Sequence, residues 1–66
     1  MSDDASRRRS ILGVLKPGVG LTASEVGRRA HLSTSVAARL LKELVKDGAA
    51  RSAVASDKRT IVYSLS

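Results

Sequence analysis

The chain has 66 residues and contains no cysteine, no tryptophan and no phenylalanine. Without cysteine there is neither a disulfide framework nor a thiolate metal site, and the single histidine, His31, cannot hold a metal ion alone. Uninterrupted hydrophobic runs reach only two or three residues, which is too short to span a bilayer. The first residues are polar and acidic, unlike a secretory signal peptide. We therefore expect one small cytoplasmic domain that is held by aliphatic packing and needs no metal or cofactor.

Aromatic side chains are almost absent, since Tyr63 is the only one. Modules that bind single-stranded nucleic acids stack bases on exposed aromatic rings, and this chain has no such platform. It does carry an excess of positive charge, with 12 Lys and Arg against 6 Asp and Glu and a net charge of +6. That balance favours a polyanionic partner, with nucleic acid ahead of an acidic membrane face. Together the two observations favour double-stranded DNA, and we expect no membrane partner.

The acidic residues do not form a catalytic constellation. They are scattered over predicted caps, turns and helix surfaces, and no nucleophile stands beside a base. No glycine-rich loop has the length needed to cradle a phosphate. We therefore expect that the protein is not an enzyme. The six acids are Asp3, Asp4, Glu25, Glu43, Asp47 and Asp57.

The first element is a helix predicted within "ASRRRSILGVLKPG". Ile11 and Leu15 lie one turn apart, and Pro17 ends the helix because proline disfavours helical backbone at the residue before it. Residues 1–9, with the arginine triplet at 7–9, are expected to form a flexible basic arm ahead of a domain at 10–66. The triplet also fits the exposed first turn of the helix.

A second helix is predicted from about Ala23 to Ala30. Thr22 and Glu25 have the spacing of a capping box, in which two side chains satisfy the free backbone donors at a helix start. Only "HLS", residues 31–33, separates this helix from the next one. A link that short fits the crossing of a helix-turn-helix, with Leu32 filling the gap between the helices.

The third helix, at about 34–47, has the clearest pattern. Ser33 or Thr34 caps its start, and Gly48 ends it as the residue in the left-handed conformation. Its residues separate into two faces, of which one is expected to pack and the other to stay open. Ala37, Leu40, Leu41 and Leu44 form the apolar face, and Ser35, Ala38, Arg39, Lys42 and Lys46 form the small or cationic face.

After Gly48 the hydrophobic period changes to two. The segments "AARSAVAS" and "RTIVYSLS" predict a β-hairpin whose tip, at about 56–59, carries Asp57, Lys58 and Arg59. The expected fold is therefore mainly α with a small antiparallel β-hairpin, an α+β class with three helices.

The residues "LTASEVGRRAHLSTSVAARLLKELVKDGAARS" and "DKRTIVYSL" resemble the winged helix-turn-helix cores of bacterial regulators, in particular the MarR-like and ArsR-like types. The resemblance covers Ile11 to Leu65. It implies that the helix at 34–47 is a recognition helix for the DNA major groove and that the hairpin is a basic wing. Helices for dimerisation or effector sensing are not evident, so we expect a constitutive binder, such as a small bacterial or phage regulator.

The expected DNA contacts lie on the open face of the recognition helix, on the wing and on the second helix. Arg39 is expected on a guanine edge or a phosphate, and the lysines on phosphates or in solvent beside Glu43 and Asp47. Arg28 fits a backbone contact and a plain surface position equally well. The full set is Ser33, Thr34, Ser35, Ala38, Arg39, Lys42, Lys46, Arg28, Lys58 and Arg59.

The function expected from these patterns is sequence-selective or architectural binding of double-stranded DNA by a nucleoid-associated transcriptional regulator. Two alternatives stay open, namely a winged-helix protein–protein interaction module and a nonspecific nucleoid-associated DNA-binding protein. A single module of this kind covers only about 600–1,000 Å² of DNA-facing surface, so a homodimer or a cooperative array on DNA is also expected.

Overall fold

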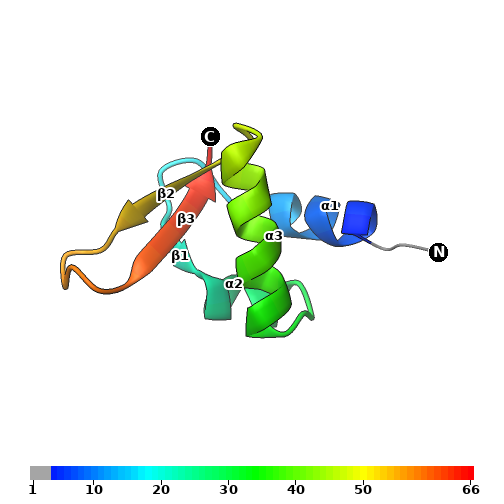
Figure 1. Cartoon of the computed structure of the whole chain (residues 1–66), viewed down its shortest axis with the longest axis horizontal. Coiled ribbons are helices and arrows are strands. Elements are labelled where there is room, and N and C mark those ends of the chain that lie inside the picture. The colour runs from blue at the N-terminus through cyan, green and yellow to red at the C-terminus, as the bar shows by residue number, and fades with distance from the viewer. Residues whose placement is uncertain (1–3) are drawn as a thin grey trace.

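The computed structural model describes residues 4–66 as three helices and a small antiparallel sheet (Figure 1). This is the α+β class expected from the sequence. Besides the two strands of the hairpin, the sheet has a strand that the sequence analysis did not assign, in the short segment before the second helix. This strand is β1, and the strand order in the sheet is β1-β3-β2. The elements are α1 (Asp4–Val14), β1 (Leu21–Thr22), α2 (Ala23–Arg29), α3 (Thr34–Lys46), β2 (Ala50–Val54) and β3 (Ile61–Leu65).

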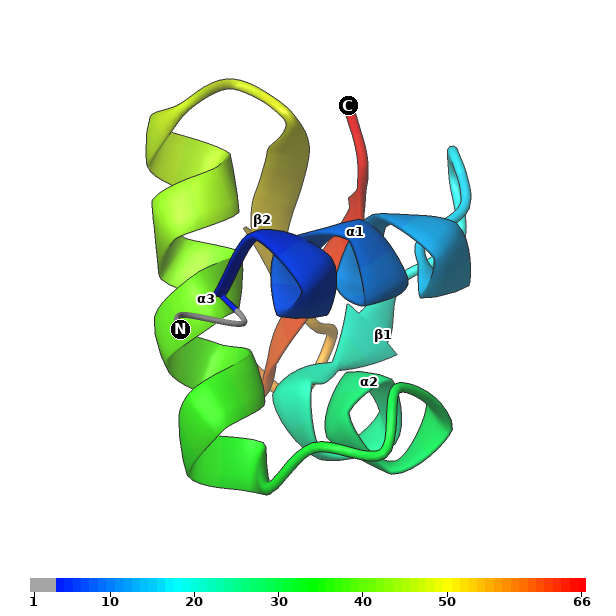
Figure 2. The ribbon, with the colours of Figure 1, turned by 90° about the vertical axis from the view of Figure 1, so that its right-hand side faces the viewer.

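Helix α1 begins earlier than the sequence predicted, because residues 4–9 are helical and do not form a flexible arm. Asp4 accepts a hydrogen bond from the Arg7 side chain at 3.5 Å within the first turn, where a negative charge favours the helix. Arg8 forms an ion pair with Asp47 just beyond α3, and α1 packs against both other helices (Figure 2). The structure therefore contradicts the predicted arm over residues 4–9. Residues 1–3 of the predicted arm lie outside the described residues.

Helix α2 starts at the predicted capping box. The backbone N–H of Glu25 donates to the Thr22 hydroxyl, and the Glu25 carboxylate accepts from the Thr22 backbone N–H, both at 3.2 Å. The Thr22 backbone N–H and the Thr22 hydroxyl, which also donates to the Glu25 carboxylate at 3.2 Å, lower the pKa of Glu25. The box therefore fixes the start of α2 directly after β1.

The turn between α2 and α3 is tight, and its geometry sets the crossing of the two helices. The Leu32 backbone N–H donates to the Gly27 carbonyl at 2.7 Å, and His31 adopts a left-handed φ of 59°. A Cβ on Gly27 would stand 2.8 Å from the Leu32 carbonyl oxygen. Leu32 itself packs against the core, as the sequence predicted.

Helix α3 has the predicted caps and the predicted buried face. The Ser33 hydroxyl accepts from the Val36 backbone N–H at 3.2 Å, and Gly48 follows the helix with a φ of 84°. All four residues of the predicted apolar face are buried, and the three leucines belong to one core cluster with Ile11, Val26 and Tyr63. The helices within residues 4–66 are not long and apolar enough to cross a membrane.

The hairpin formed by β2 and β3 extends away from the helices (Figure 1). Its strands pair antiparallel, with Ser52 opposite Tyr63 and Val54 opposite Ile61. Near the helices, the face of the hairpin that carries Tyr63 packs against the core, and Tyr63 is only 6% exposed. Farther out the hairpin leaves the core, so its outer part is available to a partner. We call this outer part, residues 53–62, the wing.

Candidate nucleic-acid interface

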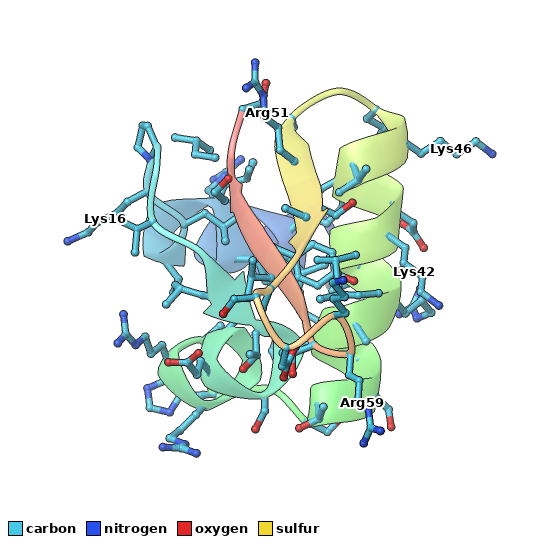
Figure 3. All side chains as sticks on the ribbon, turned by 90° about the vertical axis from the view of Figure 1, so that its left-hand side faces the viewer. Lys16, Lys42, Lys46, Arg51 and Arg59 are labelled. Atoms are coloured by element: carbon cyan, nitrogen blue, oxygen red, sulfur yellow. The ribbon has the colours of Figure 1, made fainter. Side chains whose placement is uncertain are left out.

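The outer face of α3 carries the residues that the sequence predicted for DNA. Ser35, Arg39, Lys42 and Lys46 follow one another at intervals of four, three and four residues, which places them on one side of a helix. All four are exposed, and Ala38 beside them is half-buried. Figure 3 shows Lys42 and Lys46 projecting to the same side, with Lys16 on the opposite side of the molecule. We call these four residues the outer stripe.

The leading turn of α3 presents only small side chains. Ser33, Thr34 and Ser35 are all exposed, and the Ser33 hydroxyl already accepts the capping bond from Val36. Small residues at the start of a helix let its backbone approach a flat or grooved partner closely. Free backbone N–H groups in this first turn favour negatively charged groups such as phosphates.

Arg39 is held by two carboxylates on the surface. Its Nη1 lies 3.3 Å from Glu43 Oε2, one turn along α3, and its Nη2 lies 3.5 Å from Asp4 Oδ1 in α1. The side chain is still 51% exposed, and exposed ion pairs of this kind contribute little free energy. A phosphate or a base edge can therefore replace these carboxylates without a large cost.

For the two lysines of the outer stripe, the sequence left open phosphate contacts and a solvated face partly paired with Glu43 and Asp47. In the structure those carboxylates pair with Arg39 and Arg8. Within residues 4–66, neither Lys42 nor Lys46 forms an ion pair with a carboxylate. Their ammonium groups are thus available to an external anion.

The tip of the wing is closed by a network around Asp57. The Asp57 carboxylate accepts from the backbone N–H groups of Arg59 and Thr60, both at 2.9 Å, and from the Thr60 hydroxyl at 2.7 Å. Lys58 adopts a left-handed φ of 63°, and its N–H donates to the Ala55 carbonyl at 2.8 Å. The turn therefore directs its one carboxylate back to the backbone and leaves Lys58 and Arg59 exposed.

These features place a small-residue helix start, a cationic outer stripe and a basic hairpin tip on a helix-turn-helix scaffold. Residues 6–53 match the family model of the IclR helix-turn-helix domain. The chain belongs to this family. No curated protein and no solved structure matches it significantly.

Membership in the IclR helix-turn-helix family supports DNA binding by the helix-turn-helix, with DNA as the partner. It confirms the winged helix-turn-helix resemblance but not the finer MarR-like or ArsR-like type. The match ends at Ala53 in β2. The tip of the wing lies beyond it, so a role for Lys58 and Arg59 depends on the structure alone.

Arg28 is not part of the outer stripe. It lies in the last turn of α2, exposed and next to Arg29. Both arginines lower the pKa of Glu25 slightly further, after the larger effect of the Thr22 hydrogen bonds. Arg28 therefore lies on a different helix of this IclR-type domain from Arg39 and Lys42.

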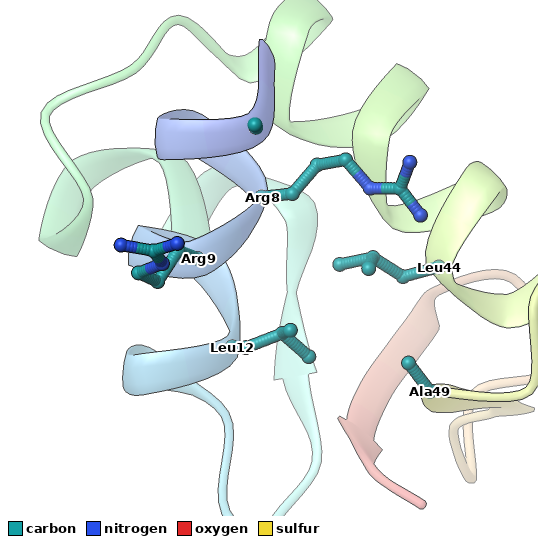
Figure 4. Close-up of a pocket in the computed structure, with 6 residues that line it drawn as sticks. Arg8, Arg9, Leu12, Leu44 and Ala49 are labelled. Carbon is teal, nitrogen blue, oxygen red and sulfur yellow. The ribbon is translucent and has the colours of Figure 1, made fainter. Parts of the chain in front are cut away.

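An open hollow lies between α1 and the C-terminal half of α3 (Figure 4). Its lining is mostly apolar and includes Leu12, Leu44 and Ala49, together with Arg8 and Arg9. No group of three or more possible metal ligands occurs among residues 4–66. The hollow holds no converging titratable groups of the kind that catalysis requires.

The sequence interpretation missed two features of the surface. The first is a set of two ion pairs that join α1 to α3 and to the residue after it. Asp4 pairs with Arg39, and Arg8 pairs with Asp47. Their partners are 35 and 39 residues apart in the chain, so no local spacing indicates them. The second is the exposed pair Val54 and Ile61. Both residues are equally far from the centre of the turn, and this spacing would have indicated that they are paired across the hairpin.

The Asp57 network predicts a specific response of the wing to acid. The hydrogen bonds from Thr60 and Arg59 lower the pKa of Asp57 from 3.8 to about 2. Since the folded-state pKa is below the unfolded value, the stabilisation of the turn is complete above pH 3.8 and is lost as the pH falls toward 2. We expect the Asp57 carboxyl resonance to titrate near pH 2 in an NMR experiment.

The matched variant for this titration is Asp57→Asn. It should remove the acid-dependent shifts of the Arg59 and Thr60 amide signals, because the asparagine amide does not titrate. A midpoint for Asp57 at its ordinary value of 3.8 would contradict the hydrogen-bonded turn.

Proposed function

We propose that this domain is the DNA-reading module of a transcriptional regulator, with α3 in the major groove. The observation that carries the proposal is the division of α3 into one fully buried face and one exposed face. Leu40 and Leu41 are 0% exposed, whereas the outer stripe is open and cationic. A major groove about 12 Å wide accepts one helix with this distribution of side chains.

The residues of α3 take different roles in this proposal. Ser33, Thr34 and Ser35 let the start of the helix approach the bases and phosphates closely, and half-buried Ala38 leaves room for a base edge or a thymine methyl group. Arg39 leaves its two carboxylates for a guanine edge or a phosphate, because its planar guanidinium forms paired hydrogen bonds with either. Lys42 and Lys46 neutralise phosphates farther along the groove.

The wing and α2 extend the contact along the duplex. Lys58 and Arg59 lie at the end of the hairpin and are exposed, so they fit phosphates or the edge of the neighbouring minor groove. Arg28 in α2 contacts the backbone beside the major groove. These contacts orient the domain on the duplex, and α3 supplies the reading of sequence.

Two copies of the domain are needed for selective regulation in this proposal. A single module of this size covers about 600–1,000 Å² of interface, which limits both its affinity and the number of bases that it reads. We propose a homodimer or a cooperative array that forms on DNA, with two sites on one face of the duplex.

The proposal predicts a strong dependence of DNA affinity on salt. Arg39, Lys42, Lys58, Arg59 and one further arginine would neutralise about five phosphates, so log K against log salt concentration should have a slope of roughly −4 to −5 on B-DNA. Fluorescence anisotropy with a labelled duplex at several salt concentrations measures this slope.

The same titration separates the other candidate functions. A protein-interaction module would bind duplex DNA only weakly, and that binding would not depend on Arg39. An architectural protein would show the steep slope but bind unrelated duplexes with equal affinity. A regulator should show the steep slope together with a preference among duplexes selected from a random pool.

A further inference from the structure

The wing carries an exposed aliphatic pair that the contacts proposed above do not use. Three large hydrophobic residues within 4–66 are exposed, namely Val19 (46%), Val54 (62%) and Ile61 (48%). Two of them, Val54 and Ile61, are directly opposite each other in the β2–β3 ladder. We call Val54 and Ile61 the wing pair.

The register of the hairpin shows which way the wing pair faces. Side chains alternate between the two faces of a strand, so Ile61 shares its face with Tyr63, two residues on. Tyr63 is buried in the core together with residues of α3. The wing pair therefore lies on the side of the sheet that bears α3, at the point where the hairpin has passed beyond the helices.

The charge around the wing pair indicates its partner. Lys58 and Arg59 follow directly at the tip and are exposed. The only carboxylate of the tip, on Asp57, is occupied by three hydrogen bonds within the turn. The result is a short aliphatic strip bordered by two cations.

A DNA groove wall has the complementary chemistry, because it presents apolar deoxyribose rings bordered by phosphates. We infer that Val54 and Ile61 contact deoxyribose rings along the minor groove of the duplex that α3 reads. The inference depends on the proposed function, since α3 must first bring the duplex to this side of the sheet. It assigns to the wing a contact that does not depend on salt, beside the phosphate contacts of Lys58 and Arg59.

The test is a double substitution, Val54→Thr with Ile61→Thr, which keeps both residues β-branched and therefore keeps their preference for a strand. We expect about tenfold weaker binding to duplex DNA, because at least one methyl or methylene group is lost from each contact. The slope of log K against log salt should not change. The matched control is Val19→Thr, which alters an exposed valine outside the wing and should leave the affinity unchanged.

The contrast with the cations of the tip sharpens the result. Lys58→Ala with Arg59→Ala should reduce the magnitude of the salt slope by about two, whereas the double threonine variant should not. Wild-type affinity in the double threonine variant would overturn the inference. So would a dimer in the absence of DNA, detected by sedimentation, that the same variant abolishes, because the pair would then serve a second copy of the chain.

A measurement on the unsubstituted protein covers the case in which the double variant fails to fold. In a methyl-labelled complex with duplex DNA, the Val54 and Ile61 methyl signals should shift and show contacts to deoxyribose protons, and those of Val19 should not. If the α3 amide signals shift while the methyl signals of the wing pair do not, this inference is wrong and the proposed function stands. If neither set of signals shifts, both are wrong.

Discussion

Replacing Arg39 and Lys42 together by alanine is expected to weaken DNA binding at least about a hundredfold. One contact to a base edge contributes about 1–3 kcal/mol, and each lost phosphate contact also reduces the salt slope by about one. Arg39 and Lys42 are exposed at the centre of the outer stripe, so the substitutions do not disturb the core. Affinity at two salt concentrations, with a thermal melt of each variant, measures the effect.

A control with the same change of charge isolates the role of position. Lys16→Ala with Arg29→Ala also removes one lysine and one arginine, both exposed. Lys16 points away from the side that bears Lys42 (Figure 3). This control should retain affinity within a few-fold of the original domain. Equal losses in the two double variants would mean that net charge, and not the outer stripe, determines binding.

The largest expected effect on stability comes from Gly27→Ala. An alanine Cβ at this position would stand 2.8 Å from the Leu32 carbonyl oxygen and 3.3 Å from the Ala37 Cβ. Two backbone segments would have to separate, which costs about 2–3 kcal/mol by analogy with other overpacked sites. A domain of this size has only about 3–10 kcal/mol in total. We expect Tm to fall by roughly 10–20 °C.

Gly13 provides a control of opposite sign for this prediction. It lies within α1, and a Cβ there would meet no atom within 4 Å. Gly13→Ala should therefore stabilise the domain by about 0.5–1 kcal/mol, because alanine favours a helix more than glycine does. A Gly27→Ala variant as stable as the original would contradict the close approach of α2 to the turn. DNA affinity should fall with stability in Gly27→Ala and stay unchanged in Gly13→Ala.

Local chemistry explains why most of the helix-turn-helix was predictable from the sequence. The capping box of Thr22 and Glu25, the cap at Ser33 and the end at Gly48 are all short-range signals, and each is present in the structure. The two faces of α3 follow from spacing alone, since burial there is decided by the period of 3.6 residues. The exposed residues predicted for DNA are consequently on the surface, and their contacts with DNA stay a prediction.

Tertiary contacts explain what the sequence analysis got wrong. The arginine triplet fits a flexible basic arm as well as the exposed first turn of a helix. In the structure, Arg8 pairs with Asp47, which lies 39 residues farther along the chain. Leu21 fits the start of a brief strand as well as a hydrophobic staple before α2, and only the pairing of β1 with Tyr63 and Val62 decides for the strand. Contacts over such distances in the chain leave no period or motif in the sequence.

The central claim is that the outer stripe of α3 and the tip of the wing contact one duplex together. Its most direct test is a titration of the nitrogen-15-labelled domain with duplex DNA, followed residue by residue in two-dimensional NMR spectra. The account predicts the largest shifts at 33–42 and at 57–59, with little change at Lys16 and Arg29. Shifts confined to α1 and the back of α2, with α3 unaffected, would contradict it.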